Sequence, residues 1–109
     1  MMINFKLRAQ ILKAMAHPSR LMMLEALKEG ELCVCDLQKI VGSDISTVSK
    51  HLSVMRNAGI VEDRKAGLQV FYKLRVPCIM NFFDCVDMVM FTHFARPNEQ
   101  IDTININAL

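Results

Sequence analysis

Residues 31–59 read ELCVCDLQKIVGSDISTVSKHLSVMRNAG, and this stretch decides the fold because it predicts two helices joined by a short turn. The first helix is predicted over residues 32–41 and ends at Gly42, since glycine often terminates helices. Asp44 is a good N-cap, so the second helix is predicted over residues 45–57. Apolar side chains recur every three or four residues along it, which indicates one buried face. The stretch therefore predicts a helix-turn-helix.

The residues before and after this stretch predict three more helices. Residues 5–15 show apolar side chains at the spacing of an amphipathic helix. Pro18 suits the first position of a second helix, which Gly30 ends. A final helix is predicted to start near Pro77 and to extend through Phe94, and it is apolar nearly all round. We therefore expect that helix to be buried between two subunits.

After the helix-turn-helix the period of the apolar pattern changes. Residues 60–65 and 68–74 are short β-forming runs joined at residues 66–67 by Ala-Gly, which predicts a hairpin with a flexible tip. A helix-turn-helix followed by a hairpin is a winged helix-turn-helix. The predicted fold class is thus mainly α with a small β-hairpin, dimeric through the terminal helices. Residues 1–96 are predicted to form one domain for DNA binding and dimerisation, and residues 97–109 a loosely ordered tail.

Length and composition exclude several classes of protein. A chain of 109 residues is long enough for one domain, and 52% hydrophobic residues leave apolar surface for a partner chain. The start of the chain has charges among its apolar residues, unlike a signal peptide, and no apolar run reaches the roughly 20 residues of a membrane helix. We therefore expect a cytoplasmic homodimer that does not enter a membrane. In that reducing compartment, four cysteines indicate metal or redox chemistry more than structural disulfides.

The net charge of +2 conceals an uneven distribution. Residues 1–49 contain six Lys/Arg and five Asp/Glu, residues 50–75 contain six and two, and residues 76–109 contain one and four. The basic excess is thus concentrated in the second helix of the pair and in the hairpin, which is typical of a surface that contacts DNA phosphates. A solvated protein face shows the same charge pattern, so the charge alone leaves both alternatives open.

Side chains of the second helix suit the major groove of DNA because they are hydrogen-bonding or cationic. Hydroxyl groups near the helix start can reach base edges or phosphates, and the basic groups can bind phosphate oxygens. The hairpin tip offers basic and amide groups to the neighbouring DNA backbone. The alternative is that the hydroxyls only cap the helix and that the basic residues keep an edge hairpin soluble. The predicted DNA-binding residues are Ser46, Thr47, Ser49, Lys50, His51, Arg56, Arg64, Lys65 and Gln69.

These motifs occur together in a known family. The chain contains HPSRLMMLEAL, ELCVCDL, TVSKHLSVMRNAGIV and VFYKL in that order, and over roughly residues 5–75 it resembles the ArsR/SmtB family of bacterial metal-sensing repressors. The resemblance implies a dimeric winged-helix repressor that binds its operator, an inverted repeat, without ligand and releases it when a metal or metalloid binds. A thiol enzyme would need a CxxC motif or a phosphate-cradling loop, and this sequence has neither. We therefore expect no enzymatic activity.

Cys33 and Cys35, in the phrase ELCVCDL, are the candidate inducer ligands. Residues two apart on a regular helix point about 200° apart, so both thiols can hold one ion only if the helix deforms. The start of a helix favours thiolate, which is the ligating form, and thiolates prefer trivalent arsenic or antimony, cadmium, lead, zinc or copper(I). A disulfide across so short a loop is not expected. The alternative is that the two cysteines are small buried hydrophobes.

A third sulfur ligand is missing from this phrase. Many arsenic-sensing members of the family have a third cysteine three residues after the pair, where this chain has Gln38. Cys78 and Cys85 lie about 10 Å apart along the predicted final helix, which is too far to share one ion. Either one is a candidate to complete a site with Cys33 and Cys35, and both are equally well explained as core residues.

Other kinds of sensor remain open from the sequence. A redox or reactive-sulfur sensor of the same fold would also use a reactive cysteine, and it would form a disulfide or polysulfide where a metal would bind. The family's zinc site on the final helix uses paired Asp/His ligands, and Asp84, Asp87 and His93 do not reproduce that pattern. His17 and His51 have no carboxylate partner in the sequence, so we assign neither a catalytic role. The identity of the inducer and the operator sequence stay open.

Overall fold

A computed structural model describes residues 2–94, and the predicted tail at residues 97–109 lies outside them. The chain divides into two compact units, of which the first ends at Val76 and the second begins at Pro77. The second unit contains α5 (Ile79–Val89) and the π-helical turn η1 (Met90–Phe94). The first unit contains, in chain order, α1 (Phe5–Met15), α2 (Pro18–Leu27), β1 (Leu32–Cys33), α3 (Val34–Val41), α4 (Ile45–Asn57), β2 (Val61–Ala66) and β3 (Gln69–Leu74).

Local contacts fix the ends of the helices. The Asn4 side chain accepts a hydrogen bond from the Leu7 N–H at 3.0 Å before α1, and Asp44 Oδ1 accepts one from the Thr47 N–H at 2.7 Å before α4. Each bond satisfies a backbone donor that has no partner inside its helix. Gly42 ends α3 with a φ of 79°, in the left-handed region that favours glycine. The predicted turn between the two helices is thereby confirmed.

The sheet is antiparallel, with strand order β1-β3-β2. β2 and β3 form the predicted hairpin, in which Val61 at the base of β2 lies opposite Leu74. β1 pairs with the other edge of β3, where Cys33 lies opposite Phe71. This third strand ties the segment before α3 to the hairpin.

The prediction of a continuous helix over residues 32–41 is wrong at its start. Leu32 and Cys33 form β1, and α3 begins only at Val34. The backbone of the two residues pairs with β3, and the Cys33 side chain becomes buried in the core. The partner strand lies far along the chain, so the local apolar pattern does not reveal this pairing.

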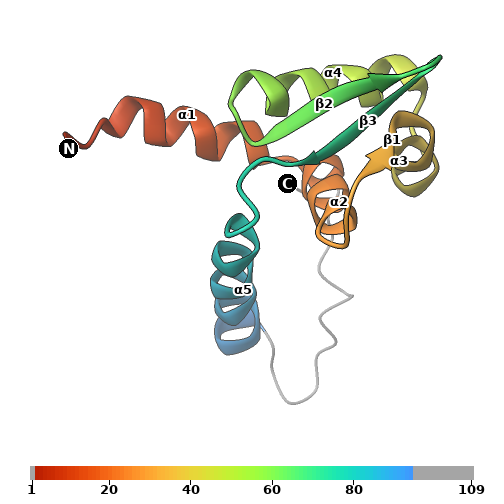
Figure 1. Cartoon of the computed structure of the whole chain (residues 1–109). Helices are drawn as coiled ribbons and strands as arrows, with labels where there is room; N and C mark the ends of the chain where they lie inside the picture. Colours follow the sequence, from red (N-terminus) through yellow and green to blue (C-terminus); the bar gives the residue numbers. More distant parts are fainter. Residues whose placement is uncertain (1, 95–109) are drawn as a thin grey trace. The chain divides into compact units, whose positions relative to one another are not determined.

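Helices α2, α3 and α4 and the base of the hairpin enclose the core of the first unit. Figure 1 shows α4 beside the β2–β3 hairpin. This packing holds the predicted recognition helix and the hairpin in one rigid arrangement, because close-packed cores resist small shifts. The largest fully buried side chains are Met23, Leu24, Leu37, Val48, Leu52, Met55 and Val61.

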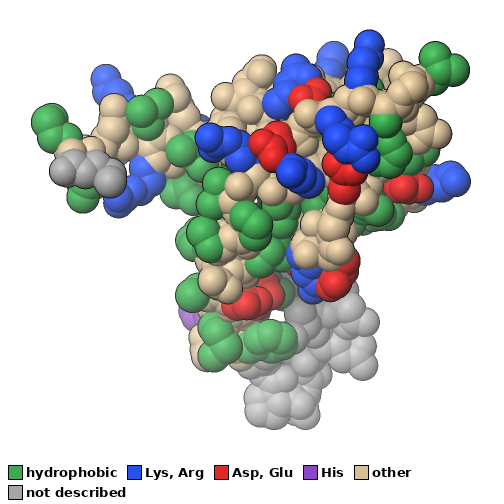
Figure 2. Space-filling view, in the orientation of Figure 1, with side chains coloured by type: hydrophobic (Ala, Val, Ile, Leu, Met, Phe, Trp, Pro, Cys, Tyr) green, Lys and Arg blue, Asp and Glu red, His purple; other side chains and the backbone are tan. Residues whose placement is uncertain are grey.

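Helix α1 extends away from the other elements of the first unit (Figure 1). It contributes only Ala14 and Met15 to the core, and Figure 2 shows apolar side chains along its surface. An amphipathic helix that exposes so much apolar surface in one chain favours burial against another chain. The apolar side chains exposed on this helix and just before it are Met2, Ile3, Phe5, Leu7, Ile11 and Leu12.

The second unit confirms a helix near the predicted position, although α5 begins at Ile79 and continues as a π-helical turn after Val89. None of its described residues is buried. Within residues 2–94, no helix combines the length and the apolar character that crossing a membrane requires. The large apolar side chains exposed in this unit are Phe82, Val86, Met88, Val89, Phe91 and Phe94.

Candidate DNA interface and cysteine site

The outward face of α4 carries most of the predicted DNA-binding residues of that helix. Three of them are exposed near the start of the helix, namely Ser46, Ser49 and Lys50. The helix begins at the N-cap Asp44, whose side chain accepts a backbone hydrogen bond from the first turn. Thr47 is partly buried, and its N–H binds the cap Asp44. Hydroxyl groups and the ammonium group of Lys50 therefore face solvent on one turn of the helix, where they can bind an approaching polyanion.

His51 differs from its predicted environment. It was expected to be an exposed cation on α4, but it is half-buried, and its Nδ1 accepts a hydrogen bond from Arg20 Nε–H at 3.1 Å. Its ring lies 4.4 Å from the ring of His17, centroid to centroid. Burial, together with the neighbouring His17 and Arg20, lowers the pKa of the His51 imidazole. The expectation of an exposed, charged His51 is therefore wrong, because α2 covers the ring.

Two predicted DNA-binding arginines form ion pairs within the protein. Arg56 binds the Asp63 carboxylate at 3.1 Å. Arg64 binds both carboxylate oxygens of Glu31, at 2.6 to 3.0 Å, and its guanidinium lies 4.8 Å from the centre of the Phe71 ring. The hydrogen bond from Arg64 lowers the pKa of the Glu31 carboxyl. These pairs link α4 to β2, and β2 to the segment before β1.

The wing carries the remaining predicted residues, Lys65 and Gln69, and both are exposed. Figure 2 shows basic and acidic side chains intermixed on the face that carries the hairpin. No carboxylate within residues 2–94 lies at ion-pair distance from Lys65 or from Lys50 of α4. These two lysines are therefore better placed than Arg56 and Arg64 to bind a phosphate without breaking an ion pair.

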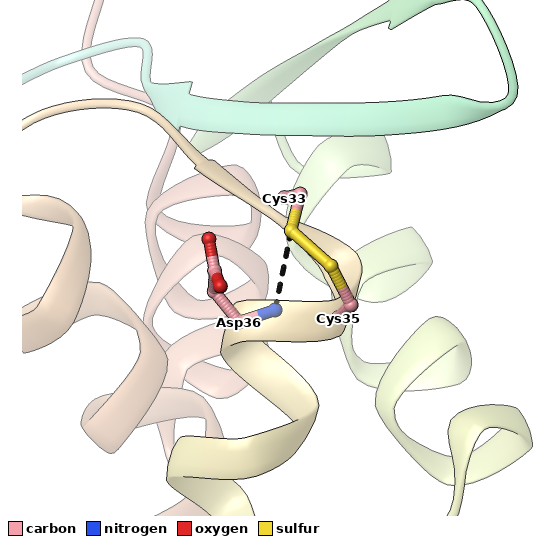
Figure 3. Close-up of side chains that lie close together, drawn as sticks. All are labelled: Cys33, Cys35 and Asp36. Carbon is pink, nitrogen blue, oxygen red and sulfur yellow. Dashed lines mark hydrogen bonds between the residues drawn. A yellow bond between two sulfur atoms is a disulfide. The ribbon is translucent and has the colours of Figure 1, made fainter.

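Cys33 and Cys35 lie together at the start of α3 (Figure 3). Cys33 is buried and is the N-cap of α3, where its sulfur accepts a hydrogen bond from the Asp36 N–H at 3.3 Å. Cys35 is exposed in the first turn. The structure joins the two sulfurs in a disulfide, with Cα atoms 5.3 Å apart.

This arrangement corrects two predictions. The thiols were expected to point apart on a helix, but Cys33 has an extended backbone (φ −78°, ψ 161°) and stands outside the helix. Its side chain can therefore turn toward Cys35, and α3 need not deform for the two sulfurs to meet. A disulfide across so short a loop was not expected either. The structure forms one because the extended backbone of Cys33 lets its sulfur reach Cys35.

A cavity of about 360 Å³ lies beside the cysteines. Its walls come from the start of α3, the start of α4 and the tip of the wing. Cys35 Sγ lies 3.9 Å from Gln69 Oε1 across this space. A group added to Cys35 would therefore lie in a cavity that α4 and the wing also line. The lining residues are Cys33, Val34, Cys35, Ile45, Ser49, Leu68, Gln69 and Val70.

Asp36 joins the two cysteines in a potential metal site that the sequence analysis missed. The ligand atoms of Cys33, Cys35 and Asp36 lie within 4.8 Å of one another, and no other group of three such ligands occurs in the described part of the chain. Two sulfurs and one carboxylate suit a thiophilic ion better than a hard one. In the sequence, Asp36 directly follows Cys35, and this position could have indicated it as a third ligand.

The other predicted ligands belong to the second unit. Cys78 precedes α5 and Cys85 lies within it, and both are exposed free thiols. Their exposure does not support their interpretation as core residues. Asp84, Asp87 and His93 form no metal-ligand cluster among the residues that the structure describes.

The fold confirms the predicted winged helix-turn-helix, which is an architecture of transcriptional regulators. The chain belongs to the arsR family of bacterial regulatory proteins, whose pattern matches residues 17–63. Membership agrees with the expectation that the chain is a regulator and not an enzyme. The family assignment alone does not select arsenic over other inducers.

Two curated relatives illustrate the similarity. The biofilm growth-associated repressor of Xylella fastidiosa is 44% identical over 66 residues, which cover 61% of this chain and 58% of the relative. The arsenical resistance operon repressor of Escherichia coli is 40% identical over 73 residues, which cover 66% of this chain and 62% of the relative. The chain thus spans about three fifths of the length of each of these relatives.

Solved structures support the family and the fold. The transcriptional repressor BigR from Xylella fastidiosa superposes with a TM-score of 0.64 at 35% identity, over 82% of this chain and 88% of that one. The homodimeric winged helix-turn-helix DNA-binding domain Mb0332 from Mycobacterium bovis superposes with a TM-score of 0.72 at 26% identity, over 87% of this chain and 88% of that one.

Proposed function

We propose that the chain is a DNA-binding transcriptional repressor that works as a cytoplasmic homodimer and releases its operator when a thiophilic ligand binds Cys33 and Cys35. One observation carries the proposal: the two sulfurs lie together at the start of α3, in a cavity that the recognition helix and the wing also line. A ligand at this point contacts both elements that would hold DNA.

The DNA contacts divide into two groups. Ser46, Thr47 and Ser49 of α4 would enter the major groove, Lys50 of the same helix would bind a phosphate, and the wing would bind the adjacent backbone. Lys65 and Gln69 of the wing are exposed, whereas Arg56 of α4 and Arg64 of the wing would have to leave Asp63 and Glu31 to reach a phosphate. A twofold dimer would present two copies of this surface, so the operator would be an inverted repeat.

Ligand binding would weaken DNA binding through the shared cavity. A ligand on Cys35 would displace Gln69, which lies 3.9 Å from the sulfur, and would press on Ser49 across the same space. Both residues belong to the proposed DNA surface, so the ligand would favour an arrangement of α4 and the wing that DNA disfavours. A typical coupling free energy of about 1–3 kcal/mol corresponds to a loss of operator affinity of about 5- to 150-fold.

Trivalent arsenic or antimony is the proposed inducer, with cadmium, lead, zinc and copper(I) as alternatives. The donor set of two thiols and one carboxylate supports a thiophilic ion, and one relative is named an arsenical resistance operon repressor. Gln38 supplies no thiolate, so the third ligand would be Asp36, Cys78 or Cys85. The thiols would bind as thiolates, which the positive end of the α3 dipole favours.

Redox sensing is a second candidate function, because the structure joins Cys33 and Cys35 in a disulfide. Oxidation by a peroxide would remove two electrons and two protons from the dithiol, form the S–S bond and reduce hydrogen peroxide to two waters. The disulfide and the metal site use the same two sulfurs, so they exclude each other.

Operator release against a panel of ligands separates the two functions. The reduced protein on a labelled operator would be titrated with arsenite, antimonite, cadmium, lead, zinc and copper(I), and separately with peroxide and persulfide. We expect arsenite or antimonite to release the DNA at the lowest concentration, in the presence of reductant. Release only by peroxide or persulfide, reversed by reductant, would assign the site to redox sensing, and release by none of them would refute the proposed switch.

The proposed homodimer would bury the exposed apolar surfaces of α1 and α5. We expect a dimer in sedimentation at micromolar concentration, because each apolar side chain removed from water contributes about 1.5–3 kcal/mol. Phe82→Ala removes two such side chains per dimer and should weaken dimerisation at least about tenfold. Leu68→Ala is the matched control, since Leu68 is fully exposed at the wing tip. A monomeric wild-type protein at that concentration would contradict the proposal.

A further inference from the structure

A cluster of cationic and titratable side chains joins α2 to the recognition helix, away from the cysteines. His51 of α4 accepts a hydrogen bond from Arg20 of α2, and its ring packs on that of His17. Arg20 also donates to the Ala14 carbonyl at the end of α1, at 3.2 Å. The His17 Nδ1 accepts from the Ser19 N–H at 3.0 Å and so caps α2. One guanidinium thus links α1, α2 and α4.

No carboxylate of the described residues forms an ion pair with this cluster. The groups around His51 are His17 at the N-cap of α2, Arg20 on α2, and Lys50 beside it on α4. Lys13 on α1 lines a cavity that Arg20 also lines, and Asp44 interacts electrostatically with Lys50. A proton on His51 would therefore add positive charge beside an arginine that forms no ion pair among the described residues.

We propose that Arg20 and the neutral His51 form a positioning pair, which holds α4 against α2 for operator binding and opens when a proton binds Nδ1 of His51. The proposal rests on the DNA-binding function proposed above. It assigns His51 a role inside the protein in place of the phosphate contact that the sequence predicted.

The chemistry of the two side chains makes the pair sensitive to one proton. Arginine is always charged and can only donate hydrogen bonds, so His51 Nδ1 must offer a lone pair. That lone pair exists in the neutral tautomer with its proton on Nε2. A proton taken up from solvent binds Nδ1, converts the acceptor into a donor that faces another donor, and removes the hydrogen bond.

The sign of the pH dependence follows from the folded environment. Burial first, and then His17 and Arg20, lower the pKa of His51 below its ordinary value of 6.5. The unfolded chain therefore binds the proton more readily than the folded chain. The stability that the pair contributes is fully present above about pH 6.5 and is lost as the pH falls through the folded-state pKa of His51.

An NMR titration of the free protein tests the pair without DNA. We expect His51 Nδ1 to be unprotonated at about pH 7.5, hydrogen-bonded to Arg20 Nε–H, and to titrate below its ordinary pKa. A protonated Nδ1 at neutral pH, or an unshifted pKa with no such hydrogen bond, would overturn the pair. The NMR titration does not depend on DNA binding. A protein that binds no operator would refute the proposed function but would leave this test of the pair valid.

Operator affinity measured from about pH 7.5 to about pH 5 tests the consequence. Wild-type affinity should fall up to about a hundredfold for each pH unit below the His51 pKa, because α4 is held in place only by the neutral form and the dimer contains two copies of His51. His51→Asn keeps an acceptor for Arg20 but cannot titrate, so its pH profile should be flat over this range. His93→Asn, in η1, is the matched control and should keep the wild-type profile.

Two results would overturn the proposal. Wild-type affinity that rises as the pH falls would mean that His51 binds a phosphate as a cation. A His51→Asn variant that keeps the wild-type pH profile would place the titrating group elsewhere.

Discussion

Operator binding is expected to weaken about 150-fold when monovalent salt rises from about 50 to about 200 mM. Lys50 and Lys65 are the proposed phosphate contacts that form no ion pair among the described residues. Two lysines in each of two protomers neutralise about four phosphates, and the expected slope of log affinity against log salt is about −3.6. Counterion release sets this slope independently of the base sequence.

The same measurement decides whether the arginines leave their ion pairs. If Arg56 and Arg64 abandon Asp63 and Glu31 for phosphates, about eight contacts form and the slope steepens to about −7. We expect the shallower slope, because each arginine would lose a hydrogen-bonded carboxylate within the protein in exchange for a phosphate.

Lysine substitutions inside and outside the proposed DNA surface supply the controls. Lys50→Ala should remove two contacts per dimer and reduce the slope to about −1.8. Lys6→Ala lies on α1, outside the proposed DNA surface, and should leave the slope unchanged. Binding that does not depend on salt, or that is unaffected by both Lys50→Ala and Lys65→Ala, would show that the recognition helix and the wing are wrongly assigned.

Features that depend on neighbouring residues were predictable from the sequence. Asp44 caps α4 through a contact three residues away, and Gly42 ends α3 through its own backbone conformation. The hairpin likewise follows from two adjacent runs and their connecting turn. In each case the deciding interaction lies within a few residues, where spacing and propensity carry the information.

The sequence-based predictions were wrong where residues far apart in the sequence are in contact. The pairing of β1 with β3 moves Cys33 out of the helix, and this change determines whether the two sulfurs can reach each other. His51 lies 31 residues from Arg20, so no local pattern shows that its ring is covered. The positions of the candidate residues could therefore be predicted from the sequence, but the directions of their side chains could not.

Replacing either Cys33 or Cys35 with serine is expected to abolish ligand-induced release of the operator while operator binding persists. Serine is a good N-cap, so Cys33→Ser should keep the contact with the Asp36 N–H and the start of α3. Cys35 is exposed and makes no core contact that serine would lose. The hydroxyl does not ionise at neutral pH and cannot replace a thiolate ligand, so the expected 5- to 150-fold response, about the size of a typical allosteric coupling, should vanish.

The remaining candidate ligands can be separated by the same assay. Asp36→Asn, Cys78→Ser and Cys85→Ser should each be titrated with arsenite, and the variant that loses the response identifies the third ligand. Asp36 lies within ligand distance of both sulfurs in one chain. Cys78 and Cys85 belong to the second unit. A response retained in all three variants would place the site on two thiolates, with a third ligand from solvent or a small thiol.

The outcome for Cys33→Ser decides what the two cysteines do. The structure buries Cys33 and exposes Cys35, so a role as small buried hydrophobes explains the first residue but not the second. A sensing role explains both, because the buried sulfur is fixed as the helix cap while the exposed one faces the cavity beside Ser49 and Gln69. If Cys33→Ser still releases DNA at the wild-type arsenite concentration, the metalloid switch is refuted. Cys33 is then a capping core residue, and Cys35 is a surface thiol beside the wing.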